Sequence, residues 1–193
     1  MALNETRNVT VGKPKVGGAI FRAPHGTTVP TNATEPLSDA FENVGYITED
    51  GVVNSNSKDT ENVKAWGGDT VLTTLTDVTD TWQFALLETL SKTANQFRYG
   101  SKNVSGEGTV DDNLVIRSNN SQAEIETIVI EMIFSNNAFC RVVIEKGQIT
   151  ETEDITYVDG EAVAYGVTVT ALPGSDGDTH KKYIVTNSGD VSE

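Results

Sequence analysis

This chain has a large excess of β-branched residues. Its 193 residues include 22 valines and 25 threonines but only nine leucines. Branching at Cβ favours extended strands over helices. Apolar and polar residues also alternate along two segments, 78–86 and 163–170, which is the pattern of strands with one buried face. We therefore predict a mainly β protein.

Turn signals divide the β-rich runs into a series of hairpins. Paired Gly, Asp and Asn residues supply the positive φ that tight turns require. These pairs are Asp50–Gly51, Gly67–Gly68, Asp111–Asn113, Lys146–Gly147 and Asp159–Gly160. The apolar run Ile125–Phe134 predicts a central strand that turns at Asn136–Asn137 into another strand, Phe139–Glu145.

Three segments depart from this pattern. Apolar residues at helical spacing predict one helix over about 86–99, which Gly100 would end. Residues 52–65 are polar and predict a long inter-strand loop, a kind of segment that is often functional. Residues 1–40 are rich in Gly, Pro, Thr and Asn and predict an extended N-terminal arm. Residues 41–193 would then form a single β domain.

The charge balance argues against several classes of partner. The net charge is −14, whereas tight binding to DNA or to an anionic membrane needs clustered Lys and Arg. Residues 1–30 carry +3, so the remaining residues carry −17. No apolar stretch approaches the roughly 18 residues of a membrane-spanning helix. We expect a soluble protein, with no membrane partner, that is made and kept in a cytoplasm.

The sequence favours neither catalysis nor a bound cofactor or metal. His25 and His180 lie in no recognisable hydrolase motif, and catalytic triads cannot be identified by sequence position. Cys140 lies in an apolar run and is predicted to be a buried small hydrophobe. Residues 175–178 lack the spacing of a calcium loop and predict a solvated turn.

Three segments together resemble one known family. They are Val11–Pro24 (VGKPKVGGAIFRAP), Asn43–Gly51 (NVGYITEDG) and Lys64–Asp69 (KAWGGD). Over roughly residues 9–100 the chain is similar to the major tail protein, or tail tube protein, of long non-contractile-tailed bacteriophages. The resemblance implies a β-sandwich or open barrel with one flanking helix. It also implies hexameric rings whose neighbouring strands join into one barrel around a channel.

The same resemblance implies surfaces by which rings stack into a tube. An N-terminal arm would contribute Val11, Lys13, Lys15, Ile20, Phe21 and Arg22. A loop would contribute Asn54, Asn56, Lys58, Asp59, Glu61 and Lys64. An acidic lining would let DNA slide through during ejection, because it repels phosphate. The candidates for that lining are Asp69, Asp77, Asp80, Glu124, Glu126 and Glu131.

The resemblance also implies partners and a location. Besides copies of itself, the subunit would meet a tape-measure protein in the lumen and a terminator that caps the tube. It would be a structural part of the virion tail, assembled in the cytoplasm of the bacterial host. A related tube of a secretion or contractile injection system would share the fold.

A binding module is the alternative from a different class. A monomeric β-sandwich of a host-recognition appendage would bind carbohydrate, with Trp66 or Tyr99 as a stacking platform. That alternative predicts a stable monomer with saturable glycan binding that is lost in Trp66→Ala. Tube function predicts self-assembly instead.

Overall fold

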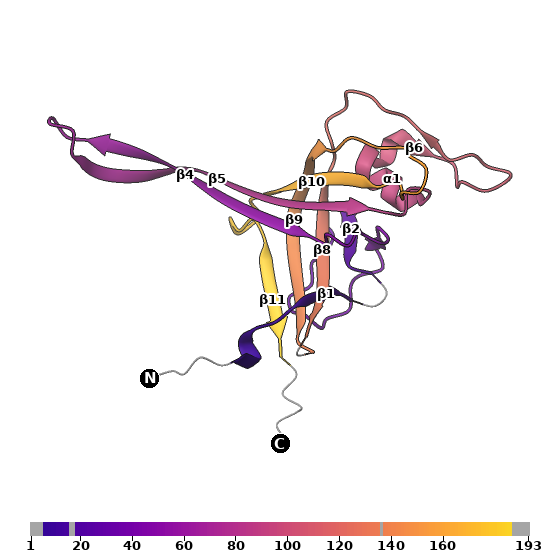
Figure 1. Ribbon diagram of the computed structural model, residues 1–193, viewed down its shortest axis with the longest axis horizontal. Helices are drawn as coiled ribbons and strands as arrows, with labels where there is room; N and C mark the ends of the chain where they lie inside the picture. The colour runs from indigo at the N-terminus through magenta and orange to yellow at the C-terminus, as the bar shows by residue number, and fades with distance from the viewer. Residues whose placement is uncertain (1–5, 16–17, 136, 187–193) are drawn as a thin grey trace, which may run out of the picture.

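The computed structural model describes residues 6–15, 18–135 and 137–186, and its strands dominate the fold (Figure 1). The strands are β1 (Gly12–Pro14), β2 (Ile20–Pro24), β3 (Glu42–Asn43), β4 (Val53–Lys64), β5 (Thr70–Leu86), β6 (Val104–Ser105), β7 (Val115–Ile116), β8 (Ile125–Phe134), β9 (Phe139–Thr152), β10 (Tyr165–Leu172) and β11 (Lys181–Val185). One α-helix, α1 (Lys92–Tyr99), and two short 3₁₀ helices, η1 (Thr6–Asn8) and η2 (Ser101–Asn103), complete the described elements. The prediction of a mainly β protein with one α-helix is confirmed.

Nine strands form one antiparallel sheet: seven follow the order β3-β2-β8-β9-β10-β5-β4, and β1 and β11 pair with β8 and β9. Its two long central strands each change partner along their length. β8 pairs with β2 over one half and with β1 over the other, while β9 pairs with β11 and then with β10. Figure 1 shows β8, β9 and β11 running steeply while β10 and β5 cross the view, so the sheet is strongly bent. β6 and β7 form a separate two-stranded ladder.

The bend lets the sheet enclose its own core together with α1. Leu86, Val169, Ile130 and Ile144 are completely buried and come from four different strands. Phe97 of α1 packs against Phe84 of β5, with ring centroids 6.0 Å apart. The alternation predicted at 78–86 is confirmed where it meets the body, because Trp82, Phe84 and Leu86 belong to this core.

β9 is longer than the sequence indicates. The predicted strand at 125–134 is confirmed as β8, but Lys146–Gly147 is not a turn. Gly147 lies inside β9, opposite Glu126 of β8 and Ala171 of β10. A Cβ at this position would lie 2.6 Å from Cδ1 of Ile128, so glycine here permits a close approach between neighbouring strands.

The helix is shorter than predicted. Residue 86 ends β5, and α1 begins at Lys92 after Ser91, whose side chain accepts a hydrogen bond from the backbone N–H of Ala94. Leu86 is buried in the core as a strand residue, whereas Leu90 is exposed. Leu86 therefore completes the strand pattern, and Leu87 follows the end of the strand. Only the second half of the predicted segment forms a helix, because the N-cap stands at Ser91.

The structure builds much of the predicted N-terminal arm into the subunit. β2 pairs with the centre of β8, and Ile20 is completely buried. Residues 25–40 pack over the sheet, where the buried Arg141 guanidinium donates to the backbone oxygens of Asn32 and Glu35, each at 2.7 Å. Residues 1–5, 16 and 17, part of the same predicted arm, lie outside the described residues.

Candidate assembly surfaces

The most prominent surface feature is a hairpin that leaves the body of the subunit. We call residues 53–79 the hairpin arm; they comprise all of β4 and the distal part of β5. Figure 1 shows the arm projecting far from the rest of the sheet. The ladder runs from Val53 opposite Gln83 to Lys64 opposite Thr70. Gly67 and Gly68 at its tip have φ of 125° and 100°, which confirms the turn predicted there.

The arm corrects the prediction of a loop over 52–65. Residues 53–64 form one continuous strand, and every one of them is exposed. In a sequence, a strand is usually recognised by alternating apolar and polar residues, which reflect one buried and one exposed face. Here both faces of the ribbon meet solvent within the subunit, so the strand carries polar residues on both faces. It pairs instead with the Thr- and Val-rich β5.

Several apolar side chains of the arm are exposed to solvent in the subunit. Trp66 at the tip is fully exposed, and more than half of the surface of Val71, Leu72 and Leu75 is accessible. A two-stranded ribbon alone is at best marginally stable in water. Such exposed apolar surface marks a site of interaction. The outer edge of β4 is also unpaired within the described residues, and an edge of twelve residues can template pairing with another chain.

A polar cluster holds the base of the arm to the body. The carboxylate of Asp80, completely buried on β5, accepts hydrogen bonds from Nδ2 of Asn54 at 2.8 Å and from Oγ1 of Thr179 at 2.6 Å. Nδ1 of His180 lies 2.6 Å from the same carboxylate, and its ring meets Trp82 edge-on. The segment before β11 therefore fixes where the arm leaves the sheet.

Three of the six predicted lumen acids lie inside the subunit, which corrects that prediction. Asp80 belongs to the cluster above. Glu126 is buried near Arg22, whose Nη1 lies 3.2 Å from Oε1, and burial raises the pKa of Glu126 to about 7. Glu131 is buried between Arg141 and Lys15, with Nζ of Lys15 2.7 Å from Oε2. A buried carboxyl group needs a polar partner close by, and all three have theirs within the subunit, so none of them faces a channel.

The other three predicted lumen acids lie in two places. Asp69 is exposed at the tip of the arm, and Asp77 is exposed on β5, directly opposite Asp59 of β4. Glu124 is half-buried just before β8 and lies 3.4 Å from Nζ of Lys102. The structure therefore does not gather the six candidates on one surface of a single subunit.

The two predicted stacking sets also differ in their placement. All six positions between Asn54 and Lys64 are exposed on β4. In the N-terminal set, Val11 and Lys13 are exposed, Phe21 and Lys15 are half-buried, and Ile20 and Arg22 are buried in the subunit. Sequence reasoning missed the apolar contribution of β5, namely Val71, Leu72 and Leu75. The alternation of Thr with Val and Leu after Gly68 was the available signal.

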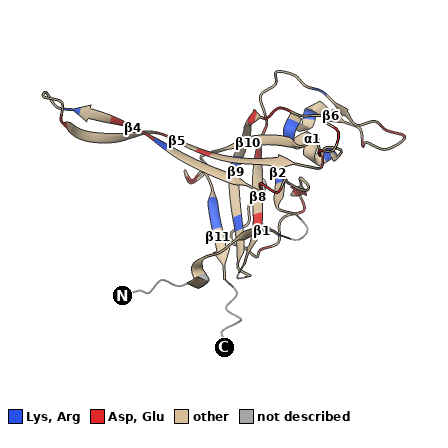
Figure 2. Ribbon diagram, in the orientation of Figure 1, with Lys and Arg blue, Asp and Glu red and all other residues tan. Residues whose placement is uncertain are grey.

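Charges of both signs are distributed along the arm and the body (Figure 2). The arm carries four exposed carboxylates and two lysines, so it is acidic. These are Asp59, Glu61, Asp69, Asp77, Lys58 and Lys64. Asp59 and Asp77 face each other across the ladder, and like charges in that position repel.

The remaining candidate residues are placed as follows. Cys140 is buried, as predicted, and residues 175–178 form an exposed turn. The structure does not bring Trp66 and Tyr99 together, because Trp66 is at the arm tip whereas Tyr99 packs edge-on against Tyr165 of the body. Across residues 6–15, 18–135 and 137–186, no helix is long and apolar enough to cross a membrane, and no three potential ligand side chains gather as a metal site.

Comparison with known proteins gives one family and several similar solved structures. The family model described as phage tail tube protein matches residues 1–191. No curated protein matches the chain. The similar solved structures include one described as the tail of an empty GTA particle, computed with helical refinement and C6 symmetry. It is 11% identical, with a TM-score of 0.40, over 97% of this chain and 100% of that chain.

Proposed function

The chain belongs to the phage tail tube protein family, and we propose that its subunits form hexameric rings that stack into a tube around a channel for DNA. Family membership makes the protein a structural component of the virion tail. The ring number is the one implied by the sequence resemblance. The role that we propose is structural and not catalytic.

The observation that carries the proposal is the uncovered hairpin arm. Its apolar side chains and the open edge of β4 are exposed in the subunit and would be buried by neighbouring copies. An edge that would be a liability in a monomer then serves as an assembly element. The arm is the stacking or ring-closing element, and the exposed Val11 and Lys13 of the N-terminal segment provide a further contact between rings.

The proposed channel would be acidic. The net charge of −14 per subunit is multiplied around a ring, and an acidic wall repels the phosphates of passing DNA. Asp69 remains a candidate for that wall because it is exposed at the tip of the arm, whereas the three buried acids are not. Asp77 and Glu124 are also accessible in the isolated subunit, but they lie on surfaces that neighbouring copies would cover.

The proposal extends to the partners of the tube. A tape-measure protein would occupy the lumen during assembly, a terminator would cap the tube, and assembly would take place in the host cytoplasm. These partners rest on the family resemblance. A tube belonging to a related injection system would use the same subunit contacts.

The experiment is negative-stain electron microscopy of the purified protein at low and moderate salt, together with its mass in solution. We expect rings or hollow tubes. The matched variant replaces residues 59–77 by Asn-Gly, because Lys58 and Val78 are cross-strand partners and Asn-Gly makes a tight hairpin turn. It keeps the body and removes most of the arm.

The arm-shortened variant is expected to stay folded and monomeric. Normal tubes from that variant would overturn the role of the arm. A wild-type protein that stays monomeric at every concentration and binds glycan through Trp66 would overturn the tube proposal in favour of the carbohydrate-binding module.

A further inference from the structure

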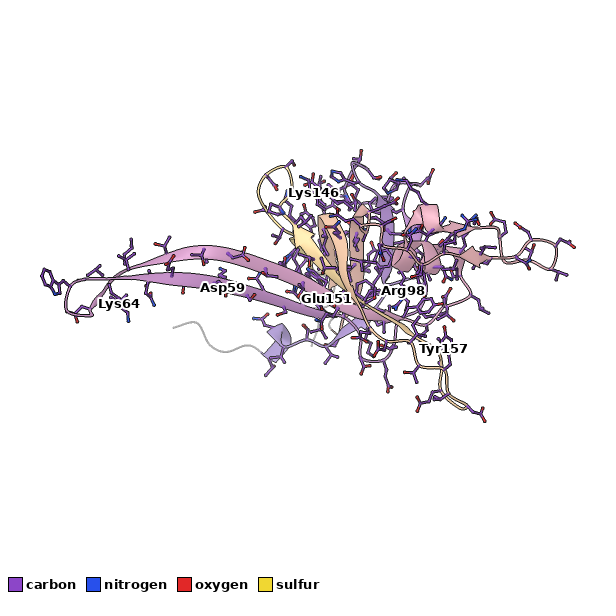
Figure 3. The ribbon with its side chains drawn as sticks, turned by 90° about the horizontal axis from the view of Figure 1, so that it is seen from above. Asp59, Lys64, Arg98, Lys146, Glu151 and Tyr157 are labelled. Atoms are coloured by element: carbon purple, nitrogen blue, oxygen red, sulfur yellow. The ribbon has the colours of Figure 1, made fainter. Side chains whose placement is uncertain are left out.

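We propose that a groove beside α1 receives the hairpin arm of a second copy of this chain, with the outer edge of β4 adding to a free edge of β9; this inference rests on the proposed tube function. The groove has a volume of about 840 Å³. It lies between the end of α1 with η2, the segment 117–124 and the last residues of β9. Figure 3 places Arg98 and Glu151, which line it, on the body, away from Asp59 and Lys64 of the arm.

The groove is held open by hydrogen bonds within the subunit. The backbone N–H of Arg117 donates to the backbone oxygen of Asn103 at 2.8 Å, and Nδ2 of Asn119 donates to the Asn103 side chain at 2.8 Å. Nε2 of Gln148 donates to the backbone oxygen of Ala123 at 2.7 Å. These contacts fix the wall at 117–124 against η2 and β9. A docking segment would therefore meet a preformed site, which lowers the entropic cost of binding.

The floor of the groove carries an unpaired strand edge. β8 begins at Ile125, opposite Gln148 of β9, and the chain before it turns away along the groove wall. β9 continues over residues 149–152, where it pairs with β10 on its other side. Within the described residues no strand occupies the β8 side of this stretch. Four residues of open edge therefore line a groove, and strand addition is the binding mode that satisfies such an edge.

The occupant that fits is the arm, because it offers the complementary edge and the complementary charge. The outer edge of β4 is the long unpaired strand edge of the same chain. The groove lining includes three cationic side chains, Arg98, Lys102 and Arg117, against two carboxylates, Glu124 and Glu151. The arm, in contrast, has four carboxylates against two lysines. Opposite potentials on two surfaces favour their association in one register.

One pairing can be specified at the level of residues. Asp59 and Asp77 face each other across the arm, and neither carboxylate forms an ion pair within the described residues. The exposed side chain of Arg117 has no hydrogen bond or ion pair within the described residues. A guanidinium can bridge two carboxylates through its several N–H donors. Arg117 of one copy would therefore bind the Asp59–Asp77 pair of another and relieve their repulsion.

The placement of the two surfaces determines what kind of assembly they make. The arm and the groove are different patches of one chain, so the contact is heterologous, with each copy giving its arm to one neighbour and receiving an arm from another. Such contacts generate closed rings or open helical stacks instead of isolated dimers. Both outcomes agree with a tube.

The test is site-directed crosslinking in assembled tubes. Differently tagged chains carrying Glu61→Cys and Ser118→Cys are mixed, assembled and oxidised. Both positions are exposed, and neither side chain makes a hydrogen bond or ion pair within the described residues. We expect a disulfide between unlike chains, which requires Cα atoms roughly 4.4–6.8 Å apart. The control replaces Ser118→Cys by His25→Cys, at an exposed position outside the groove, and is expected to give no crosslink.

A charge swap provides the second readout. Arg117→Glu is expected to reduce tube yield at least tenfold at low salt, and Asp77→Arg in the same chain is expected to restore it. Tubes that form normally without the Glu61–Ser118 crosslink, with Arg117→Glu tubes unaffected, would overturn the groove assignment and leave the tube function standing. Failure of the wild-type protein to assemble would overturn both proposals.

Discussion

The guanidinium of Arg141 and the carboxylate of Glu131 form a buried ion pair across β8 and β9, with Nε 2.9 Å from Oε1. Their side chains are 2% and 5% exposed. Arg141 also donates to two backbone oxygens of the segment 25–40, at Asn32 and Glu35. One buried arginine thus joins the sheet to the polypeptide that covers it.

Removing this arginine should strongly destabilise the subunit. Arg141→Leu leaves the Glu131 charge buried without its main partner and two backbone acceptors unpaired, and breaking such a pair costs about 3–5 kcal/mol. Urea unfolding of the monomer measures the loss. Lys15→Met removes the other cation on Glu131, but Lys15 is 40% exposed, so we expect a cost below about 1 kcal/mol. Equal losses in the two variants would contradict this account.

Stability should fall between about pH 4.5 and pH 7 because of Glu126. Burial raises the pKa of its carboxyl to about 7, helped by Glu124 and Glu42 and opposed by Arg22. The folded state therefore holds a proton that the unfolded chain has released, so raising the pH through this window favours unfolding. A shift from 4.5 to about 7 corresponds to roughly 3 kcal/mol.

Glu126→Gln should remove that part of the pH dependence. We expect the free energy of unfolding of the variant, measured in urea from pH 4 to pH 8, to exceed that of the wild type by an amount that grows between about pH 4.5 and pH 7 and then levels off. The exposed Glu49→Gln serves as the matched control and should track the wild type. Parallel curves for Glu126→Gln and the wild type would show that folding does not raise the pKa of Glu126.

A methyl group at residue 147 should destabilise the sheet. The Cβ of Gly147→Ala would lie 2.6 Å from Ile128 Cδ1 and 3.1 Å from Val169 Cγ1. Overpacking of this kind costs about 1–3 kcal/mol. Gly12→Ala is a strand glycine whose added Cβ meets its nearest neighbour at 3.6 Å, and we expect little change there. Thermal unfolding of both variants is the measurement. A loss in Gly147→Ala alone indicates a packing cost at residue 147, whereas equal losses would mean that strand glycines in general do not tolerate alanine.

Trp66→Ala should reduce tube formation and leave the stability of the folded subunit nearly unchanged. Because Trp66 is fully exposed in the subunit, its loss should change monomer stability by no more than about 0.5 kcal/mol. Tube formation, followed by light scattering and electron microscopy, should fall sharply because an aromatic anchor is lost from the interface. The matched control is Val110→Ala, another fully exposed apolar residue outside the arm. A tube yield unaffected by Trp66→Ala would exclude the arm tip from the contacts.

Cys140 should be unreactive in the folded protein. Its thiol is 1% exposed, and burial raises its pKa, so the thiolate that attacks disulfide reagents is scarce. We expect reaction with a thiol reagent at pH 8 to be at least tenfold slower than in urea. Rapid modification of the native protein would show that β9 opens readily at this position. Slow modification lets the introduced cysteines be crosslinked without replacing Cys140.

Much of the body could be predicted from sequence because buried strands carry apolar residues either in alternation or in continuous runs. The strand at 125–134 and the alternation at Trp82, Phe84 and Leu86 were correct for this reason. The extension of β9 through Gly147 could not be predicted, because a Lys-Gly pair is typical of a turn. The reason for a glycine inside the strand is the close approach of Ile128, which the sequence does not show. The start of α1 was misplaced because apolar residues 86 and 87 fit a helix and a strand end equally well.

The candidate surfaces depended more on tertiary structure. The sequence indicated that residues 54–64 matter but not that they form a strand, since a ribbon with two solvated faces has no alternation to detect. The six acidic candidates looked alike in sequence. Three of them turned out to be buried beside partners from other parts of the chain, such as Arg141 for Glu131 and His180 for Asp80.

The class of fold, the family and the acidic charge follow from residue types and their local order, so the sequence alone was sufficient to predict them. The buried charges, the point where the arm leaves the body and the open strand edges became known only from the three-dimensional structure. Those properties depend on contacts between residues far apart in the chain: Asp80 meets Thr179 and His180 only because β5 and the segment before β11 converge in space.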